Sequence, residues 1–203
     1  MVAEPDRSEV LAPPPPPRDL AERLGHVALR LSGWRVVGAR PTAPRFVMIV
    51  APHTSNWDGV ILILTALALR VRLYWLGKHT LFEPPFGSFV RWLGGIPIDR
   101  TSSHNAVEQA VQWFNRQRQA VLVIAPEGTR HKTTRWKTGF YHIAQGANVP
   151  LVLGFMDYRR KAAGIGPVIE PSGDIEADMQ VMQAFYRGIT GRHSHRMSDV
   201  TLG

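Results

Sequence analysis

Apolar residues along this chain form short continuous runs that alternate with stretches of helical periodicity. Val121 to Ala125 is continuously apolar, which is typical of a strand that is covered on both faces. In the intervening stretches, apolar residues recur every three or four positions, as they do along one face of a helix. The pattern predicts strands at 46–51, 71–76, 96–98, 121–125, 149–155 and 168–169, and helices at 19–31, 57–69, 106–118, 138–145 and 174–187. Strands that alternate with helices indicate a single α/β domain with a mixed, mainly parallel sheet flanked by helices.

The two ends of the chain depart from this pattern. Residues 1–18 hold few apolar residues and five consecutive prolines, Pro13 to Pro17, which favours a disordered tail or a polyproline II spacer. Residues 191–203 show no clear period and are predicted to form a loose tail. Residues 19–190 are therefore expected to form the domain.

Two apolar segments are candidates for membrane contact. The predicted helix at 19–31 has an apolar stripe on one face: Leu20, Leu24, Val27, Ala28 and Leu31. A moderately basic amphipathic helix of this kind either packs its stripe on the core or lies on a membrane surface. The longest apolar stretch, Val60 to Leu69, has about half of the ~20 residues that a helix needs to cross a bilayer. It is expected to be a buried helix or one that touches a membrane interface.

Composition and charge narrow the chemistry without choosing a function. The chain has no Cys, which excludes disulfides, thiolate catalysis and cysteine zinc sites, and which fits a cytoplasmic location. Lys and Arg exceed Asp and Glu by 24 − 16 = 8. Such a basic surface attracts nucleic acid, anionic lipid, or phosphorylated substrates and carriers. The N-terminal residues M-V-A-E-P-D-R-S-E do not resemble a secretory signal.

His53 and Asp58 form the first candidate site, between a predicted strand and a predicted helix. Ser55 and Asp58 fit a helix capping box, which explains Asp58 without any chemistry. His53 is not explained in this way. If His53 precedes the cap, the Asp58 carboxylate can reach one ring nitrogen and leave the other free as a general base. Both interpretations remain open on this stretch alone.

The second candidate site is the segment V-L-V-I-A-P-E-G-T-R at 121–130. It places Glu127, Gly128, Thr129 and Arg130 directly after a buried strand. In parallel α/β sheets, ligands bind at that end of the strands. Arg130 is suited to clasp a phosphate, because its guanidinium can donate two parallel hydrogen bonds. The alternative is a β-turn with an internal ion pair between Glu127 and Arg130.

The third candidate segment runs from residue 77 to residue 100. It contains three cations that follow or flank predicted strands and could define a patch for an anionic ligand: Lys78, Arg91 and Arg100. It also contains four aromatic residues that either line a site for an apolar substrate or belong to the core: Phe82, Phe86, Phe89 and Trp92. Its Gly94-Gly95 pair is not part of a dinucleotide fingerprint.

Taken together, these segments resemble a known family. The order H-x4-D, G-G-I-P-I-D-R, P-E-G-T-R and V-P-L-V-L is similar to the four sequence blocks of the glycerolipid acyltransferases, typified by 1-acylglycerol-3-phosphate acyltransferase. The match runs from about Phe46 to Phe155. The resemblance implies a glycerol-3-phosphate acyltransferase-like fold. It also implies acyl transfer from acyl-CoA or acyl-carrier protein to a hydroxyl of a lysophospholipid-like acceptor, foremost 1-acyl-sn-glycerol-3-phosphate, without a metal or a bound cofactor.

The resemblance also suggests a role for each matching residue. His53 would deprotonate the acceptor hydroxyl, and Asp58 would orient His53 and stabilise its charge. The residues that match acceptor-binding positions are Lys78, Arg100, Glu127, Gly128, Thr129 and Arg130. Pro52 stands where family members often have Asn, and Ala125 stands where an aromatic residue is common. These departures remove no catalytic group, but they loosen the inference about which acceptor is used.

The resemblance leads us to expect a peripheral enzyme at the inner face of the cell membrane, in contact with anionic lipid and not with nucleic acid. One alternative is a member of the same family that acts on a different hydroxyl or an amine. A metal-dependent hydrolase would need close ligand spacing, and the only H-x-H is His193-Ser194-His195. A non-catalytic basic module that binds membrane or nucleic acid is the remaining alternative, although no nucleic-acid-binding signature accompanies the positive charges.

Overall fold

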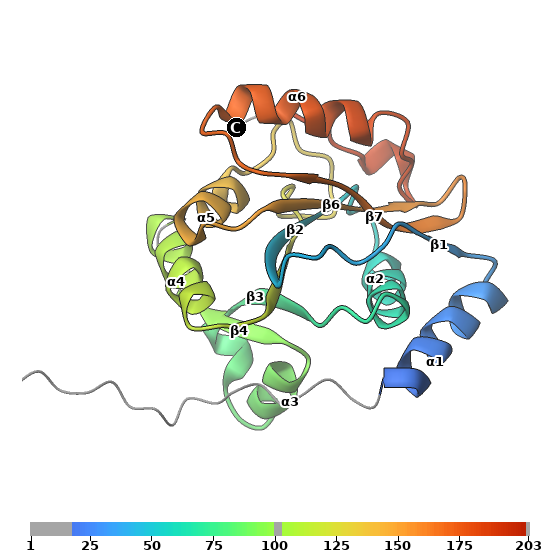
Figure 1. Cartoon of the computed structure of the whole chain (residues 1–203), viewed down its shortest axis with the longest axis horizontal. Coiled ribbons are helices and arrows are strands. Elements are labelled where there is room, and N and C mark those ends of the chain that lie inside the picture. The colour runs from blue at the N-terminus through green and yellow to red at the C-terminus, as the bar shows by residue number, and fades with distance from the viewer. Residues whose placement is uncertain (1–17, 100–102, 202–203) are drawn as a thin grey trace, which may run out of the picture.

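The computed structural model describes residues 18–99 and 103–201. The predicted proline-rich tail, except Arg18, and the candidate residue Arg100 therefore lie outside the described residues. Within those residues the chain forms one α/β domain, as the hydrophobic pattern predicts (Figure 1). No described helix is both long enough and apolar enough to span a bilayer.

The elements alternate along the chain. The strands are β1 (Arg35–Val37), β2 (Arg45–Ala51), β3 (Leu73–Lys78), β4 (Gly95–Ile98), β5 (Ala120–Ile124), β6 (Leu151–Asp157) and β7 (Ala162–Ile169). The α-helices are α1 (Arg18–Leu31), α2 (Trp57–Ala68), α3 (Gly87–Trp92), α4 (Ser103–Asn115), α5 (Gly139–Ala147) and α6 (Ile175–Tyr186). Two short 3₁₀ helices, η1 (His79–Phe82) and η2 (Ser194–Arg196), complete the described elements.

The strands form one seven-stranded sheet in the order β1-β7-β6-β2-β5-β3-β4. Every neighbouring pair is parallel except β6 with β7, which is antiparallel. The carboxyl ends of β2, β3, β4, β5 and β6 consequently meet at one edge of the sheet. This is the edge at which open α/β sheets bind their ligands.

Helices cover both faces of the sheet (Figure 1). On one face, α4, α5 and α6 pack on inward-facing residues that include Ile49, Leu122 and Leu153. On the other face, α1 and α2 pack on alternating residues that include Met48, Val121 and Val152. The central strands are therefore buried on both sides, which explains why they read as continuous apolar runs.

Helix α1 packs through a different face from the one that its apolar stripe predicts. The stripe residues Leu20, Leu24, Val27 and Leu31 are exposed. Leu29 is buried instead, and Gly25 lies so close to α2 that a β-carbon there would come within 2.7 Å of the Ala68 nitrogen. Close approach of the two helix backbones at Gly25 therefore decides the orientation of α1, and the stripe is left uncovered.

Several elements differ from the prediction in extent. β1 and α3 were not predicted, because three and six residues are too few to show a period. β7 has eight residues, whereas the apolar pattern indicated only residues 168–169. Its first half is rich in small residues, because a β-carbon at Gly164 would lie 1.8 Å from the Val37 oxygen of β1.

The C-terminal segment, predicted to be loose, makes specific contacts across the domain. The main-chain N–H of Trp136 donates to the Thr201 carbonyl over 2.7 Å, and the Gln183 side chain donates to the Val200 carbonyl over 2.6 Å. The Thr133 N–H donates to the Ser198 hydroxyl over 3.0 Å. Polar contacts with distant segments order these residues, and such contacts leave no periodic signal in the sequence.

Candidate active site

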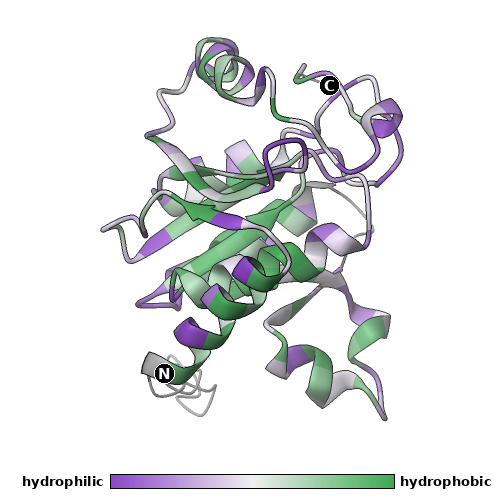
Figure 2. Cartoon of the chain, turned by 90° about the vertical axis from the view of Figure 1, so that its right-hand side faces the viewer, coloured by the Kyte–Doolittle hydropathy of each residue, from purple (hydrophilic) through white to green (hydrophobic). Residues whose placement is uncertain are grey.

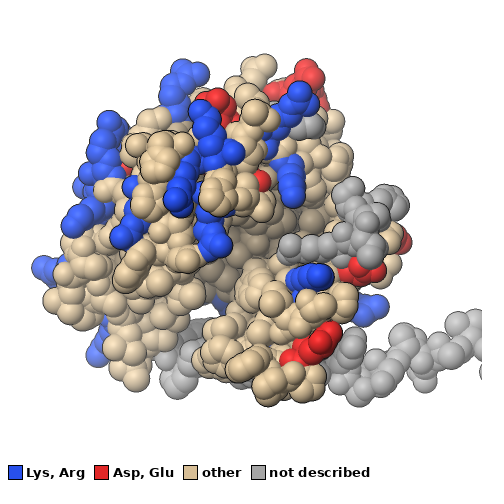
Figure 3. All heavy atoms as spheres, turned by 180° about the vertical axis from the view of Figure 1, so that it is seen from behind, with Lys and Arg blue, Asp and Glu red and all other residues tan. Residues whose placement is uncertain are grey.

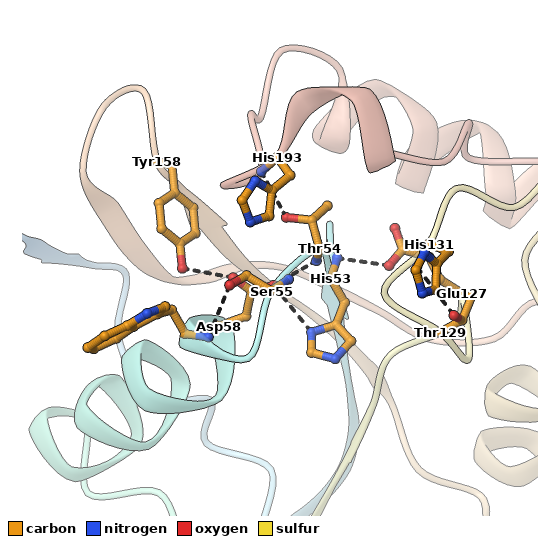
Figure 4. A network of polar contacts seen from close by, with 10 residues as sticks. His53, Thr54, Ser55, Asp58, Glu127, Thr129, His131, Tyr158 and His193 are labelled. Atoms are coloured by element: carbon orange, nitrogen blue, oxygen red, sulfur yellow. Dashed lines mark hydrogen bonds and ion pairs between the residues drawn. The ribbon is translucent and has the colours of Figure 1, made fainter.

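The predicted site residues that the structure describes lie at the carboxyl edge of the parallel strands. His53 lies two residues after β2, Lys78 ends β3, and Glu127 lies three residues after β5. Tyr158, which the sequence did not single out, follows β6 directly. Neighbouring parallel strands end side by side, so residues far apart in the sequence meet at this edge (Figure 4).

Asp58 lies in the first turn of α2, and its carboxylate turns back over the loop that precedes the helix. Its Oδ2 accepts hydrogen bonds from the main-chain N–H groups of Thr54, over 2.7 Å, and Ser55, over 2.8 Å. The Ser55 hydroxyl in turn accepts from the Trp57 N–H over 3.2 Å. The Asp58 and Ser55 contacts are those of a capping arrangement, although the helix begins at Trp57 with Asn56 as its N-cap residue.

The same Oδ2 atom of Asp58 lies 3.3 Å from Nδ1 of His53. Asp58 is 1% exposed and the His53 side chain 29% exposed, so the carboxylate is enclosed while the imidazole reaches solvent. Figure 4 shows the His53 ring turned toward Asp58 through Nδ1, with the other ring nitrogen directed away. The capping and the pairing interpretations of Asp58 are thus both met by one carboxylate.

The electrostatics of the site favour a charged Asp58. Burial by itself raises the pKa of this carboxyl, but hydrogen bonds from His53, Tyr158, Ser55 and Thr54 outweigh burial and bring the pKa below its ordinary value. The position of Asp58 in the first turn of α2 also favours a negative charge, because the N-terminal end of a helix is the positive end of its dipole.

Glu127 supports the His53 loop from the opposite side. Its Oε2 accepts a hydrogen bond from the His53 main-chain N–H over 2.8 Å, and the residue is only 4% exposed. Burial raises the pKa of Glu127 to about 7, even though the bond from His53 acts in the opposite direction. The carboxylate thus faces His53, and among the described ion pairs there is none between Glu127 and Arg130.

The remainder of the P-E-G-T-R segment forms a tight turn. Gly128 has a positive φ of 66° and its N–H donates to the Ala125 carbonyl over 3.0 Å. Lys137 packs on this turn, within 3.0 Å of the place where a β-carbon of Gly128 would lie. Thr129 accepts from the His131 N–H over 3.2 Å, and Arg130 is exposed. The turn therefore leaves the Arg130 guanidinium accessible to a ligand.

The segment after β3 is only partly consistent with its prediction. Lys78 is exposed at the carboxyl edge, and Arg91 is also exposed, with its guanidinium carbon 5.2 Å from the centroid of the Phe82 ring. Among the four aromatic residues, Phe82 is buried, and Phe86, Phe89 and Trp92 are exposed. These three residues therefore belong to the surface of the protein and not to its core.

Two parts of the site could not be found from the sequence. Tyr158 donates a hydrogen bond to Oδ1 of Asp58 over 2.8 Å, across a separation of 100 residues. The segment after α6 also reaches the site, because the His193 N–H donates to the Thr54 hydroxyl over 3.2 Å. No local motif in the sequence signals the Tyr158 contact or the His193 contact.

Within 18–99 and 103–201, no group of three or more His, Asp or Glu side chains is arranged to hold a metal ion.

The arrangement defines an α/β domain that carries a histidine–carboxylate pair at the carboxyl edge of its sheet. A family model described as Acyltransferase matches residues 35–153, which is more than half of the chain. The chain therefore belongs to the Acyltransferase family, as the four sequence blocks led us to expect.

The chain is similar to known glycerolipid acyltransferases in sequence and in structure. A 1-acyl-sn-glycerol-3-phosphate acyltransferase from Streptococcus pneumoniae is 30% identical over 115 residues, which are 55% of this chain and 42% of that protein. The chain thus matches less than half the length of this curated relative. The crystal structure of the 1-acyl-sn-glycerophosphate acyltransferase PlsC from Thermotoga maritima aligns with a TM-score of 0.58 and 20% identity. That alignment covers 83% of this chain and 76% of PlsC, and it confirms the fold.

Proposed function

We propose that this protein transfers a fatty acyl group from acyl-CoA or acyl-carrier protein to a hydroxyl of a lysophospholipid-like acceptor, foremost 1-acyl-sn-glycerol-3-phosphate. The observation that carries the proposal is the His53–Asp58 pair, with the second ring nitrogen of His53 directed away from Asp58. Membership of the Acyltransferase family and the name of the Streptococcus pneumoniae relative support the same activity and acceptor.

In the proposed reaction His53 acts as general base. Its Nε2 takes the proton of the acceptor hydroxyl, while the buried Asp58 carboxylate orients the ring and balances the charge of the imidazolium. The hydroxyl oxygen then attacks the thioester carbonyl, and the thiolate of the donor leaves when the tetrahedral intermediate collapses. The imidazolium returns its proton to that thiolate, so neither an acyl-enzyme nor a redox step is needed.

The acceptor phosphate would be bound by cations at the same edge of the sheet. Arg130 is exposed beside the turn that follows β5, and Lys78 is exposed at the end of β3. A guanidinium and an ammonium on neighbouring strands are suited to a phosphate monoester, because one contributes paired donors and the other a compact charge. Arg100 would join them from the segment after β4.

The amphiphilic substrates would be met at an anionic membrane, on the cytoplasmic side. Apolar side chains are exposed on or directly before three helices: Leu20, Leu24, Val27 and Leu31 on α1, Trp57, Val60 and Ile63 on α2, Phe89 and Trp92 on α3, and Phe86 directly before α3. The net charge of +8 would add attraction to anionic lipid. Aromatic and aliphatic side chains of this kind are suited to the boundary between lipid headgroups and acyl chains.

His53→Ala tests the proposed chemistry. We expect kcat for acyl transfer to fall by a factor on the order of 10²–10⁴, the usual contribution of a general base, with little effect on thermal unfolding. The measurement uses two donors with a labelled acyl group, one bound to CoA and one bound to acyl-carrier protein. Each donor is tested with a panel of lysophospholipid, polar hydroxyl and amine acceptors. His142→Ala is the matched control, because His142 is exposed on α5.

The panel also separates the two candidate acceptor classes. A preference for 1-acyl-sn-glycerol-3-phosphate supports the proposed acceptor, whereas a preference for an amine or a phosphate-free hydroxyl favours the alternative within the family. Near-normal transfer by the His53→Ala variant with the best acceptor would overturn the general-base role.

A further inference from the structure

The two carboxylate oxygens of Asp58 have different partners. Oδ2 accepts from the N–H groups of Thr54 and Ser55 and lies next to the His53 ring. Oδ1 accepts from the Tyr158 hydroxyl over 2.8 Å. Rotation of a carboxylate about its last side-chain bond has a broad energy profile, so contacts on Oδ2 alone fix its angle poorly. A donor on Oδ1 adds the second point that defines the plane of the carboxylate.

Tyr158 is itself held by contacts with Thr190 and Trp34. It follows β6 directly, at the same sheet edge as His53, and its main-chain N–H donates to the Thr190 carbonyl over 2.8 Å. Its ring packs edge-on against Trp34, with 4.8 Å between the ring centroids. The hydroxyl therefore reaches Asp58 from a supported position, which makes Tyr158 a preorganised donor.

The segment after α6 connects Tyr158 with the His53 loop. Its Thr190 carbonyl accepts from the Tyr158 N–H, and its His193 N–H donates to the Thr54 hydroxyl. Between these residues, Gly191 approaches the loop so closely that a β-carbon would lie 3.0 Å from atoms of Pro52 and Thr54. The β2–α2 loop, the β6–β7 turn and this segment thus form one closed set of contacts around Asp58 (Figure 4).

We infer that Tyr158 is a positioning residue for the proposed acyl transfer: its hydroxyl sets the plane of the Asp58 carboxylate, so that Oδ2 faces Nδ1 of His53. This inference rests on the proposed function. The side-chain hydroxyl of Tyr158 contacts Asp58, and in this inference its effect on the reaction passes through Asp58 and His53.

The electrostatic environment keeps the Tyr158 hydroxyl protonated, as a hydrogen-bond donor must be. Burial, and after it the hydrogen bond to Asp58, raises the pKa of Tyr158, although the nearby Arg192 acts in the opposite direction. The hydroxyl therefore carries its proton at neutral pH and donates it toward the carboxylate. Arg192 lies over the Trp57 ring, with its guanidinium carbon 5.3 Å from the ring centroid.

Tyr158→Phe removes the hydroxyl and leaves the ring contact with Trp34. We expect kcat for acyl transfer to fall by about tenfold, the scale for loss of one hydrogen bond to a charged group, with KM for donor and acceptor unchanged. Tyr141→Phe is the matched control, because the Tyr141 hydroxyl donates to another buried carboxylate, Asp178, over 2.7 Å on α6. The control is expected to lower stability and to leave kcat as in the wild type.

A double-mutant cycle with Asp58→Asn separates positioning from a general loss of stability. If Tyr158 acts through Asp58, adding Tyr158→Phe to Asp58→Asn causes less than about a twofold further loss of kcat. Multiplication of the two single effects would overturn the inference, as would a normal kcat in the Tyr158→Phe variant. A wild-type protein that acylates no member of the acceptor panel would instead refute the proposed function itself.

Discussion

At the scale of single residues, two buried carboxyl groups hold the loop that carries His53, by accepting hydrogen bonds from its main-chain N–H groups. Asp58 accepts from two N–H groups of the loop that carries His53, and Glu127 accepts from the His53 N–H itself. The resemblance placed Glu127 among acceptor-binding residues, yet its carboxylate is buried and faces the loop. We expect that any effect of Glu127 on the acceptor passes through the position of His53.

The raised pKa of Glu127 predicts a pH-dependent cost to stability. Its pKa is about 7 in the folded protein, against an ordinary value of 4.5. Well below pH 4.5 the carboxyl is protonated in both the folded and the unfolded state, so its ionisation does not affect stability there. As the pH rises to 7, the unfolded state loses this proton first and folding stability falls by at most about 3 kcal/mol, a cost that then persists above pH 7.

Glu127→Gln measures this cost, because the amide keeps an oxygen for the His53 N–H and cannot ionise. We expect the variant to gain stability relative to the wild type between pH 4.5 and 7, and to keep that gain at higher pH. Urea unfolding across this pH range is the measurement, with Glu83→Gln at an exposed position as the control. A stability difference that does not change with pH would contradict the burial argument.

At the scale of elements, the packing of α1 on α2 depends on one close approach. At Gly25 a β-carbon would lie 2.7 Å from the Ala68 nitrogen and 2.8 Å from the Leu64 oxygen, both of which are backbone atoms. Backbone atoms of a packed helix have no rotamer by which to move aside. The face of α1 that meets the core is therefore selected by the absence of a side chain at Gly25, and not by the apolar stripe.

Gly25→Ala is expected to lower the free energy of unfolding by about 1–3 kcal/mol, the usual cost of overpacking. Gly59→Ala in α2 is the matched control, because a β-carbon there meets no atom within 4 Å. That control is expected to stabilise the protein by about 0.5–1 kcal/mol, since alanine loses less backbone entropy in a helix than glycine. Thermal unfolding of both variants is the measurement, and equal stabilisation by the two alanines would contradict the packing described for α1.

At the scale of the whole molecule, the exposed apolar residues and the exposed cations are the features that bear on the proposed membrane contact. α3 and the start of α1 lie toward the same end of the molecule, and α3 contains hydrophobic residues (Figures 1 and 2). Phe86 and Trp92 are 69% and 70% exposed. Lys and Arg gather on the upper part of the face in Figure 3, above a hollow in the surface. Exposed apolar residues and positive charges each suit an anionic bilayer, because lipid offers apolar chains and negative headgroups together.

Replacing Phe86, Phe89 and Trp92 together by Ser tests the proposed membrane contact. We expect partitioning onto vesicles that contain anionic phosphatidylglycerol to fall by at least about tenfold, because burial of large apolar side chains stabilises the bound state. Vesicle co-sedimentation is the measurement. Val168→Ser with Val181→Ser is the matched control, since these apolar residues are exposed on β7 and α6. Equal binding by the two variants would exclude α3 as the contact.

The sequence predicts elements well where burial alone explains their residues. β2 and β5 were found almost to the residue, because both faces of a central strand are covered and the run is continuously apolar. α4 begins three residues before its prediction, since its first turn contains no apolar residue. β7 was found only at its end, because its pairing with β1 requires small residues that lack a β-strand signal.

By itself, the sequence determined the order of the longer strands and helices and the four family blocks, and it made His53 and Asp58 a candidate pair. All of these depend on residues that are close together in the chain or on patterns of burial. Only the tertiary structure decided which face of α1 packs, where Glu127 points, and that Tyr158 and the segment after α6 complete the surroundings of Asp58. Those contacts join segments that meet only because parallel strands end at one edge, and no local spacing in a single sequence records that meeting.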